Sequence, residues 1–589
     1  MKRIFLSILI LLPLTVYSAP VSESICRKVA ASFLESRNRI CDVNSLQLIN
    51  GRAATRAGEQ KEYYIFNTPG KGFVIISGDD SVLPVIGYSP DGEYIDDDSM
   101  TNFKHWMGIW SDAIRANRKN GLEPTADIKS EWGKYTDNGA ALAADGDEIL
   151  LETALWAQGD PYNMYCPQIG GGRAVTGCVA TAIGILMKYF EWPVAGKGTL
   201  PGYTHGSIVV QPVELGEEYD WKNMPMSLSS SSSDVEKHAV ATLLYHVGVS
   251  VKAMYGESST GAYSQDVREA LVTYMDYDRS AILKYAKNYS KEEWVSMIKN
   301  NIKNVGPLLY GGVSDAGGHQ FLVTGYDADD RFYINWGWGG ANNGYYSYPG
   351  FSDFIEGNDA IFNLKKNCGG ETPASINLIH RPGSAKPGIS LSCINIEKDI
   401  PFTAIVESFQ NAGDEPFEGE LGIARVSSGR EVIEVLGSMT VAELNETSLL
   451  PGYYFNSASF QDCTISSEPG IGEKLMGVFR AGEGFDWSVC SYDRTDPELV
   501  GEILLADPFS IEQSTSLVYL TEGKLKITSK NGVTLNLLGP NGEDLSSVVS
   551  SSEEGWEIDI TELSPADYKL QLSKDDEFKE ITVKMGLKK

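Results

Sequence analysis

Apolar residues recur at helical spacing in the first third of the chain. Residues 25–34 and 103–120 each gather apolar side chains on one face, which predicts two amphipathic helices. A third segment repeats apolar residues at offsets of three and four until Pro193, which would end a helix. Its apolar positions are Val179, Ala182, Ile183, Leu186, Met187 and Phe190. We therefore expect a buried helix that begins near residue 178.

Short apolar runs bounded by turn residues predict strands elsewhere. Residues 62–66 and 72–77 are such runs, separated by a turn that contains Pro and Gly. Residues 321–324 and 332–334 have the same texture and predict two neighbouring strands. After about residue 372 short alternating runs dominate, and the clearest are residues 402–408, 567–572 and 578–584. The second half of the chain should therefore be mainly β-structure.

These patterns divide the chain into several domains, as its length of 589 residues requires. We expect a small α+β unit over residues 19–145 and a larger unit of mixed helix and strand over 146–367. A β-sandwich of immunoglobulin type should cover residues 372–510, and a last β module residues 514–589. The stretch 137–147 is small, polar and rich in Gly, Ala and Asp, so it is a natural place for a proteolytic cut.

The N-terminus has the pattern of a secretory signal peptide. A basic start, Met1-Lys2-Arg3, precedes an apolar run over residues 4–16 and small residues that suit cleavage near residue 18. The run is too short to be read as a bilayer span, and no other stretch of about 18 apolar residues occurs. We expect a protein that is secreted or held at the cell surface, without a membrane span.

Charge and cysteine content exclude several classes of function. The net charge is −30, from 49 basic and 79 acidic residues, which argues against binding of nucleic acid. The eight cysteines are scattered with no CxxC pair, and no HExxH motif occurs, so we expect neither a metal nor another cofactor. Cys463 and Cys490 are a candidate disulfide, although the sequence alone does not fix the pairing.

Cys178 stands at the head of the third predicted helix, directly after Gly177. The unpaired N–H groups and the dipole of a helix N-terminus stabilise a thiolate and lower the pKa of the thiol. This position suits a nucleophile. A buried structural cysteine is the alternative, because free cysteines are often buried.

His319 is the candidate base. It follows Gly317-Gly318, which would leave the imidazole accessible, and it precedes the predicted strand 321–324. It lies 141 residues after Cys178 (319 − 178), within the range of about 130–150 found in papain-like enzymes. A surface histidine with no chemical role is the alternative.

Three further residues could complete such a site. Asn335 could accept the imidazole N–H of His319 and fix its tautomer, and Trp336 could shield that bond from water. The side-chain amide of Gln158, together with the backbone N–H of Cys178, could form an oxyanion hole. The alternatives are a Gly/Trp-rich turn that only packs and a solvated loop glutamine.

In this order and spacing the residues resemble papain-like cysteine proteases, and more closely the streptopain (interpain) family. The resemblance extends over essentially all of residues 150–366, and residues 20–136 resemble the propeptide of that family. The motifs that carry it are residues 158–163 (QGDPYN), 177–182 (GCVATA), 187–189 (MKY), 248–251 (GVSV), 255–256 (YG), 317–319 (GGH) and 335–340 (NWGWGG).

The resemblance implies an α+β, papain-like catalytic domain that is preceded by an inhibitory prodomain and cleaves peptide bonds. It implies that Cys178 is the nucleophile, His319 the general base and acid, and Gln158 the oxyanion donor. Asn335 and Trp336 would orient and shield the histidine, while Ser259, Gly261 and Gly318 would contact substrate. The expected partners are protein or peptide substrates, with a bulky apolar residue at the P2 position, and the protein's own prodomain.

Two other functions remain open from the sequence. One is a catalytically silent, protease-like adhesin or inhibitor, which would be expected to lack a catalytic residue. The other is a transglutaminase-like or amidase enzyme, which would be expected to have Asp in place of Asn335. The last 75 residues or so loosely resemble C-terminal β modules of extracellular Bacteroidetes proteins, some of which direct export through the type IX system, and an ordinary sandwich module is the alternative.

Overall fold

The computed structural model forms two compact units, one of residues 1–283 and 295–368 and the other of residues 284–294 and 369–589. The predicted signal peptide and most of the predicted cleavage stretch, 137–145, lie outside the described residues. The structure describes residues 20–39, 42–49, 61–136, 146–314, 317–349, 357–369, 376–380, 388–392, 396, 398–407, 409–413, 415–444, 448–455, 457–470, 472–496, 499–505, 515–521, 524–529, 534–540, 542–552, 555–559, 563, 566–574 and 577–585.

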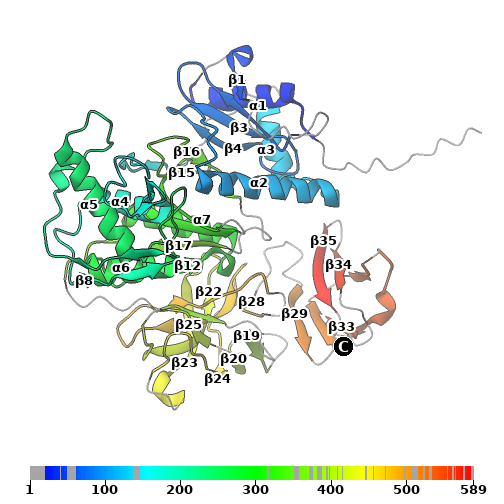
Figure 1. The fold of residues 1–589 in the computed structure, drawn as a ribbon. Coiled ribbons are helices and arrows are strands. Elements are labelled where there is room, and N and C mark those ends of the chain that lie inside the picture. Colours follow the sequence, from blue (N-terminus) through cyan, green and yellow to red (C-terminus); the bar gives the residue numbers. More distant parts are fainter. Residues whose placement is uncertain are drawn as a thin grey trace, which may run out of the picture. The chain divides into compact units, whose positions relative to one another are not determined.

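The N-terminal part of the first unit packs helices on an antiparallel sheet (Figure 1). Both predicted helices are confirmed, and so is the predicted hairpin, now β2 and β3. Ser22 caps the first helix, and the apolar faces meet around Phe33, Phe66 and Val74. The elements are α1 (Glu23–Ser36), β1 (Gln47–Ile49), β2 (Tyr63–Asn67), β3 (Phe73–Ser77), β4 (Val85–Ser89), α2 (Thr101–Asn120) and α3 (Ala126–Thr136).

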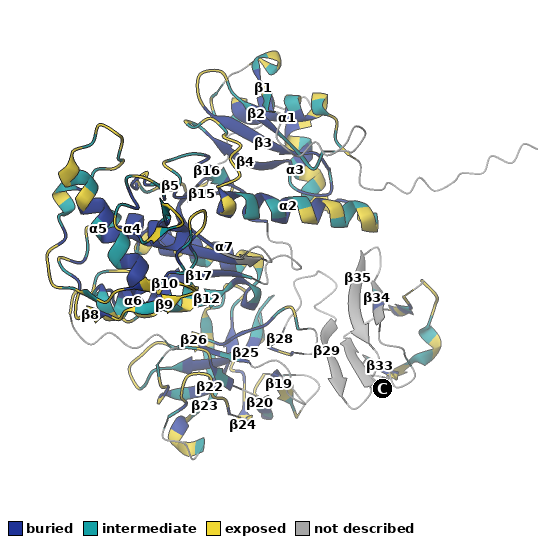
Figure 2. Ribbon diagram, viewed as in Figure 1, coloured by how far each residue is buried: buried dark blue, intermediate teal, exposed yellow. Residues whose placement is uncertain are grey.

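The rest of the first unit contains the predicted helix at residue 178, which is confirmed as α4 (Cys178–Phe190). Residues 178–187 of this helix are all buried, as Figure 2 shows, and they pack on α5 (Asp234–Ser250) and on the sheet. The two other helices are α6 (Ser264–Tyr274) and α7 (Lys291–Asn304). The start of α7, up to residue 294, belongs to the second unit. The strands that join the large sheet are β5 (Ile149–Leu150), β12 (Ile282–Tyr285), β13 (Leu308–Ser314), β14 (Gly317–Tyr326), β15 (Phe332–Asn335), β16 (Gly344–Tyr346) and β17 (Asn358–Phe362). The short strands β6 (Gln168–Ile169), β7 (Gly172–Arg173), β8 (Thr199–Leu200), β9 (Tyr203–His205), β10 (Ile208–Val210) and β11 (Val213–Glu214) form two-stranded sheets.

One 11-stranded sheet runs through the whole first unit. Its order is β1-β2-β3-β4-β16-β15-β14-β13-β17-β12, with β5 paired to β14. The join between the N-terminal strands and the later ones is the antiparallel pair of β4 and β16. The N-terminal region therefore extends the sheet that carries the candidate site, as well as packing on it.

The two faces of this sheet have different neighbours. Residues that pair across neighbouring strands share a face, and successive residues alternate. Leu309, Leu322 and Ile361 lie in one cross-strand row and belong to the core built around α4. Phe321, on the other face, packs against Trp106 of α2. The register thus assigns each residue of β14 either to the α4 side or to the α2 side.

The described elements of the second unit are strands and short 3-10 helices, apart from the start of α7. A core that includes Phe402, Phe460, Leu421 and Phe479 joins the sheets, which is compatible with the expected sandwich. Its earlier strands are β18 (Leu378–His380), β19 (Gly388–Leu391), β20 (Phe402–Glu407), β21 (Phe409–Asn411), β22 (Glu420–Val426), β23 (Val432–Thr440), β24 (Ser457–Cys463), β25 (Lys474–Arg480), β26 (Ser488–Val489), β27 (Ser491–Tyr492) and β28 (Glu502–Leu504).

The last strands of the second unit form two further small sheets. They are β29 (Thr515–Thr521), β30 (Lys524–Ser529), β31 (Thr534–Leu538), β32 (Val549–Ser552), β33 (Gly555–Asp559), β34 (Ala566–Lys574) and β35 (Glu577–Met585). The predicted strands at 567–572 and 578–584 lie within β34 and β35, which are paired with each other.

The suggested disulfide between Cys463 and Cys490 is wrong. Both side chains are buried in the core of the second unit as free thiols. The sulfur of Cys463 donates to the carbonyl of Phe460, and burial raises the pKa of the Cys490 thiol above its usual range. These cysteines therefore serve as small apolar core residues.

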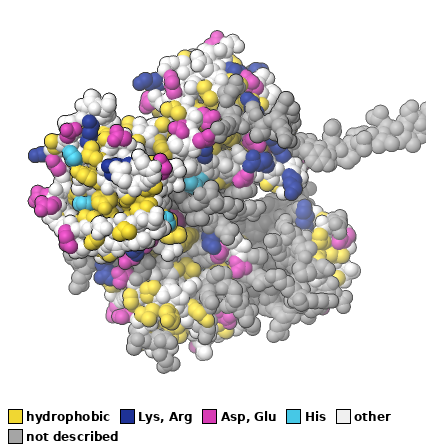
Figure 3. Space-filling view, in the orientation of Figure 1, with side chains coloured by type: hydrophobic (Ala, Val, Ile, Leu, Met, Phe, Trp, Pro, Cys, Tyr) yellow, Lys and Arg dark blue, Asp and Glu magenta, His cyan; other side chains and the backbone are white. Residues whose placement is uncertain are grey.

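On the face in view in Figure 3, basic side chains are scattered among acidic ones. No helix in the part of the chain that the structure describes combines the length and the apolar character needed to cross a membrane.

Candidate active site

Gly177 sets the direction in which Cys178 enters helix α4. Its φ of +85° lies in the left-handed region that favours glycine, and a Cβ at this position would lie 2.4 Å from the carbonyl oxygen of Thr260. Cys178 is then the first residue of the helix, and it is 8% exposed. The sequence motif Gly-Cys is thus a tight turn that places a thiol at a helix N-terminus.

Thr260 ties the loop 255–262 to the segment that leads into Cys178. Its hydroxyl donates to the carbonyl of Val175 at 2.7 Å and accepts the N–H of Gly256 at 3.1 Å. Ser259 is exposed on this loop, and Gly261 pairs with Met254. The two loop residues predicted to contact substrate are therefore held on a segment bonded to the chain beside Cys178.

The thiol of Cys178 differs from the sequence-based expectation of a lowered pKa. Burial raises the pKa of this thiol, while the backbone N–H groups of Gln320, Val179 and Cys178 itself oppose the rise. The helix N-terminus acts as expected, but the site is covered, and removing a thiolate from water costs more than those N–H groups return. In this form of the chain Cys178 is a thiol.

Gln158 lies beside this segment with an unused donor. Its backbone carbonyl accepts the N–H of Thr176 at 3.0 Å, and the residue is 4% exposed. The side-chain nitrogen is buried and has no hydrogen-bond partner among the described residues. Buried polar groups are nearly always bonded, so an unpaired amide here is suited to a ligand oxygen that the structure does not contain.

His319 lies on β14, after Gly318, and its side chain faces α2. The ring of His105, from α2, is its neighbour, with ring centroids 5.1 Å apart. Burial, and then the charge that His105 can carry, lower the pKa of His319 to about 4. Burial also lowers the pKa of His105. At neutral pH this is a pair of uncharged imidazoles.

Cys178 and His319 are not joined by a hydrogen bond in the described part of the chain. The group on β14 that reaches the thiol is the backbone N–H of Gln320, the residue after His319. Because side chains alternate along a strand, Gln320 faces α4 and His319 faces α2. The candidate nucleophile and the candidate base are therefore close in the fold but are not hydrogen-bonded to each other.

Asn335 does not make the bond to His319 that the sequence suggested. It pairs with Leu322 in the β14–β15 register and so lies on the α4 face, opposite to His319. Its amide donates to Thr153 and Ala154 at 3.0 and 2.9 Å, and its oxygen accepts the N–H of Gly337. Asn335 thus fixes the Trp-Gly turn in place.

Trp336 lies on the same side of the sheet as His319. It is 1% exposed, and its ring is 4.8 Å from that of Phe321, two residues after His319. Its indole N–H donates to the carbonyl of Asn342 at 3.0 Å. The predicted shielding residue is therefore packed against the strand that carries the candidate base.

Helix α2 covers this part of the site with polar and aromatic contacts. The amide of Asn102 donates to the carbonyl of Trp336 at 2.7 Å, and its oxygen accepts the indole N–H of Trp338 at 2.8 Å. Phe103 and Trp106 stack edge-on against Trp336 at 5.4 and 6.2 Å. Asn102 and His105 were not predicted from the sequence, although a polar side chain next to the apolar positions of the helix was a usable signal.

A second set of contacts joins the N-terminal region to the β14–β15 turn. Arg37, at the end of α1, bonds to Asp327 at 3.1 Å and also to Asp329. Arg331 bonds to the same two carboxylates at 3.2 and 2.6 Å, and the hydroxyl of Tyr88 donates to Asp327. Because Asp327 and Arg331 are buried, these charges are held in a closed network.

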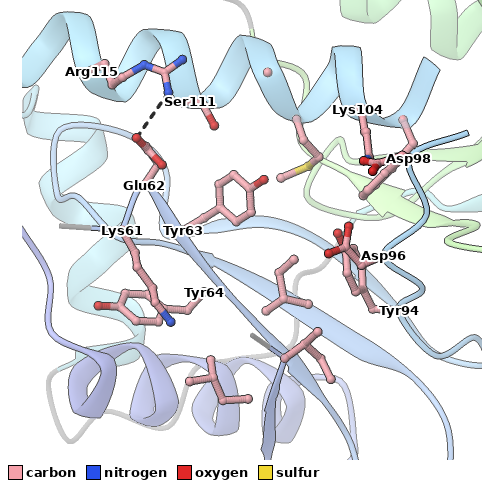
Figure 4. Close-up of a pocket in the computed structure, with 16 residues that line it drawn as sticks. Lys61, Glu62, Tyr63, Tyr64, Tyr94, Asp96, Asp98, Lys104, Ser111 and Arg115 are labelled. Carbon is pink, nitrogen blue, oxygen red and sulfur yellow. Dashed lines mark hydrogen bonds and ion pairs between the residues drawn. The ribbon is translucent and has the colours of Figure 1, made fainter. Parts of the chain in front are cut away.

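A cavity of about 330 Å³ lies on the opposite side of α2, within the N-terminal region (Figure 4). Its lining includes Tyr63, Tyr94, Ser111 and Arg115, with an ion pair between Arg115 and Glu62. None of the candidate site residues lines it. Among the residues that the structure describes, no group of three or more His, Cys, Asp or Glu is arranged to hold a metal.

Two family models match the chain. The model of the peptidase C10 family matches residues 156–346, and the model of the Spi protease inhibitor matches residues 18–114. The first range includes Gln158, Cys178, His319 and Asn335. The second includes α1, the strands β1–β4 and the part of α2 that covers the site.

Curated relatives match the same part of the chain. Streptopain of Streptococcus pyogenes is 31% identical over 303 residues, which are 48% of this chain and 73% of that protein. The thiol protease/hemagglutinin PrtT of Porphyromonas gingivalis is 30% identical over 353 residues, or 58% of this chain, but the match spans only 41% of PrtT.

Among solved structures, a fragment of prointerpain A from Prevotella intermedia is 30% identical and is covered completely, with a TM-score of 0.45 and 56% of this chain aligned. The active interpain A cysteine protease of the same organism is 32% identical, with a TM-score of 0.34 and 37% of this chain aligned. Since the streptopain match covers nearly three quarters of that protein at 31% identity, this chain belongs to the peptidase C10 family and is a cysteine peptidase with an inhibitor-like region before its peptidase region.

Proposed function

We propose that this protein is the latent precursor of a secreted cysteine endopeptidase, with Cys178 as the nucleophile and His319 as the base. The observation that carries the proposal is the position of α2. A helix from the inhibitor-like region bonds through Asn102 to Trp336 and Trp338, and places His105 against His319. Latency is expected from this arrangement, because the candidate base is held on the face of β14 away from the thiol.

In the active form, His319 turns toward Cys178 and takes the thiol proton. The thiolate sulfur bonds to the carbonyl carbon of the substrate, and the developing oxyanion accepts hydrogen bonds from the Gln158 amide and the Cys178 N–H. His319 then gives its proton to the leaving amine as the C–N bond breaks. Water, deprotonated by His319, attacks the thioester, which releases the acid and restores the thiol.

Asn335 and Trp336 support this chemistry by position. The bonds of Asn335 to Thr153, Ala154 and Gly337 hold the turn, and Trp336 packs beside the strand that carries His319. We propose that Trp336 keeps water from the imidazole in the active form. Asn335 contributes indirectly, by holding the turn that contains Trp336 in place.

The substrate-binding part of the proposal rests on Ser259, Gly261 and Gly318. The loop with Ser259 and Gly261 is tied through Thr260 to the chain at Val175, and Gly318 directly precedes His319. A substrate lying between these segments would pass Cys178. We propose a preference for a bulky apolar residue at P2, which a peptide panel with Leu, Phe, Ala, Asp and Arg at that position would measure.

Activation requires the removal of residues 19–145, with the cut in or near the stretch 137–147. The N-terminal signal peptide directs the protein out of the cell, and its substrates are proteins or peptides. A silent, protease-like adhesin is less well supported, because the candidate nucleophile, base and oxyanion donor are all present.

The test compares the wild-type precursor with a Cys178→Ala variant under reducing conditions. The wild type should lose an N-terminal fragment of about 15 kDa, a domain-sized piece, and should cleave casein, whereas Cys178→Ala should do neither. Cys166→Ala is the matched control, since Cys166 is another buried free thiol of the same core and should leave activity intact. If casein cleavage persists in Cys178→Ala, or is absent from both the wild type and the Cys166 control, the proposal fails.

A further inference from the structure

Strand β16 is an interior strand of the sheet only because the inhibitor-like region is present. In the sheet order, β16 lies between β15 of the peptidase region and β4 of the inhibitor-like region. When residues 19–145 leave, β16 becomes the edge of the sheet. An edge strand exposes backbone N–H and C=O groups and is a template for another extended chain.

The peptidase side of this edge binds β4 through more than the ladder itself. The backbone N–H of Ser347 donates to the carbonyl of Ile86 at 2.9 Å, and its hydroxyl donates to the carbonyl of Val85 at 2.8 Å. Further along, the amide of Asn342 accepts the N–H of Ile95 at 2.7 Å and donates to its carbonyl at 2.9 Å. These bonds are made only to the backbone of the bound segment, so segments of many sequences could form them.

Two tyrosines add a preference for side chains. Tyr346 pairs with Gly87, and a Cβ on that glycine would lie 2.5 Å from the Tyr346 ring. Tyr345 pairs with Tyr88, and the two rings are stacked with centroids 5.1 Å apart. The edge therefore suits an extended segment with a glycine followed by an aromatic residue.

The inhibitor-like region also shows that one chain can reach both this edge and the catalytic residues. Its β4 lies on β16, and its Asn102 and His105 lie against Trp336 and His319. Strands β16 and β14 are separated by one strand, so they lie about 10 Å apart. A substrate protein bound at Cys178 can therefore present a neighbouring extended segment to the edge.

We propose that the edge of β16, with Asn342, Tyr345, Tyr346 and Ser347, is a docking site for an extended segment of a protein substrate once the inhibitor-like region is gone. The proposal rests on the proposed function. We assign a substrate segment as the occupant because β16 has only three residues, which offer little area for binding another protein on their own. A stable complex of two proteins usually buries about 1,200–2,000 Å², whereas a substrate is already held at the cleft and needs only an added contact.

The test measures kcat/KM of the matured peptidase on casein and on a short reporter peptide that is too small to reach the edge. Tyr345→Ala and Ser347→Ala should lower kcat/KM for casein by about threefold or more each, as expected for a cross-strand aromatic pair and a hydrogen bond. Both variants should cleave the reporter at the wild-type rate. Tyr345→Phe, which keeps the ring, should cleave casein as the wild type does.

A synthetic peptide of residues 82–91 gives an independent arm. It should slow casein cleavage without slowing reporter cleavage, and the same peptide with Gly87→Val should not act, because the valine would meet the ring of Tyr346. Equal casein cleavage by the wild type and both variants would overturn the docking proposal while leaving the proposed function intact. A wild type that cleaves neither substrate would instead overturn the proposed function. A dimer in sedimentation that Tyr345→Ala abolishes would make a second copy the occupant and also overturn the proposal.

Discussion

At the scale of single residues, the unpaired amide of Gln158 is the clearest structural support for an oxyanion hole. A buried donor without an acceptor costs stability, and an oxyanion beside Cys178 would supply the acceptor. We expect Gln158→Ala to lower kcat by about 10²–10³-fold with little change in KM. Steady-state kinetics on a short peptide would measure this effect.

Gln168 provides the control for that substitution, since it is exposed and lies ten residues further along. Gln168→Ala should leave kcat unchanged. A Gln158→Ala enzyme with wild-type kcat would show that the oxyanion is stabilised by other groups.

The neighbouring imidazoles of His105 and His319 predict that latency depends on pH. Burial lowers the pKa of both, that of His319 to about 4, against an ordinary value of about 6.5. The covered state thus favours neutral rings, so its stability is fully present above about pH 6.5 and is lost as pH falls toward 4. Besides His319, Asn358 of β17 also lies at this point of the sheet, and the carboxylate of Asp112 on α2 raises the pKa of His105.

Hydrogen exchange of α2 in the inactive Cys178→Ala precursor would measure this dependence without self-cleavage. Protection of the α2 amides, corrected for intrinsic exchange, should fall between pH 6.5 and 4.5. In His105→Asn, which carries no charge at either pH, the fall should be smaller. Protection that is independent of pH in the precursor would contradict the prediction.

The candidate site residues could be proposed from sequence, but the hydrogen bonds and protonation of those residues could not. Cys178, His319 and Gln158 stand out because few residue types perform acyl transfer and their spacing is restricted. The expected bond from Asn335 to His319 failed because it depends on which face of the sheet each residue occupies. That is a matter of register, in which Asn335 pairs with Leu322 rather than with a residue on the His319 side.

At the scale of elements, α2 is the part of the inhibitor-like region that touches the candidate site. Asn102 bonds to both Trp336 and Trp338, and it is fully buried. We expect Asn102→Ala to weaken the covered state by about 1–3 kcal/mol, because it leaves the carbonyl of one tryptophan and the N–H of another unpaired. The precursor should then cleave a short peptide before any maturation cut.

The matched control is Asn117→Ala, a substitution of the same kind on the same helix. The side-chain amide of Asn117 donates to the hydroxyl of Ser81, within the inhibitor-like region, and among the described residues it makes no bond to Trp336 or Trp338. Activity of the uncut precursor, followed in the first minutes and checked by gel for absence of cleavage, should rise in Asn102→Ala and stay low in Asn117→Ala. Equal activity in the two variants would show that the bonds of Asn102 do not maintain latency.

Element boundaries followed the hydrophobic pattern, but the pairing of elements did not. Helices α1, α2 and α4 have continuous apolar faces, so periodicity located each within a few residues. The apolar residues of β4 and β16 indicate buried strands, but they do not indicate which strands pair with them. Their pairing depends on Gly87 fitting against Tyr346, a contact between residues far apart in the chain.

At the scale of the whole molecule, the two compact units do not follow the order of the sequence. Residues 284–294 lie within the range that matches the peptidase C10 model, yet they group with residues 369–589. From the sequence we expected residues 146–367 to form one continuous unit, with its C-terminal boundary near residue 370. Composition changes there, but no local pattern reveals that an internal segment folds with a later unit.

Charged contacts explain why residues 284–294 group with the second unit. Lys287 bonds to Asp493 at 2.7 Å, and its carbonyl accepts the N–H of Arg494 at 3.0 Å. Glu293 bonds to both Arg430 and Arg494 at 3.4 Å, and its side chain is only 10% exposed. Arg494 also bonds to Glu502 at 2.9 Å, so Glu293 is the carboxylate that the two guanidinium groups share in a largely buried place.

Replacing that carboxylate tests whether residues 284–294 fold as part of the second unit. Glu293→Gln should lower the unfolding free energy of that unit by about 1–3 kcal/mol, because Arg430 and Arg494 keep their charges and lose a shared partner. Calorimetry of the full chain should show the loss in one transition, with the peptidase transition and peptide cleavage unchanged. Glu292→Gln, one residue earlier and exposed, is the control that should shift neither. If Glu293→Gln instead lowers the transition that is lost together with peptidase activity, residues 284–294 belong energetically to the peptidase unit, and the charge cluster is a weak surface contact.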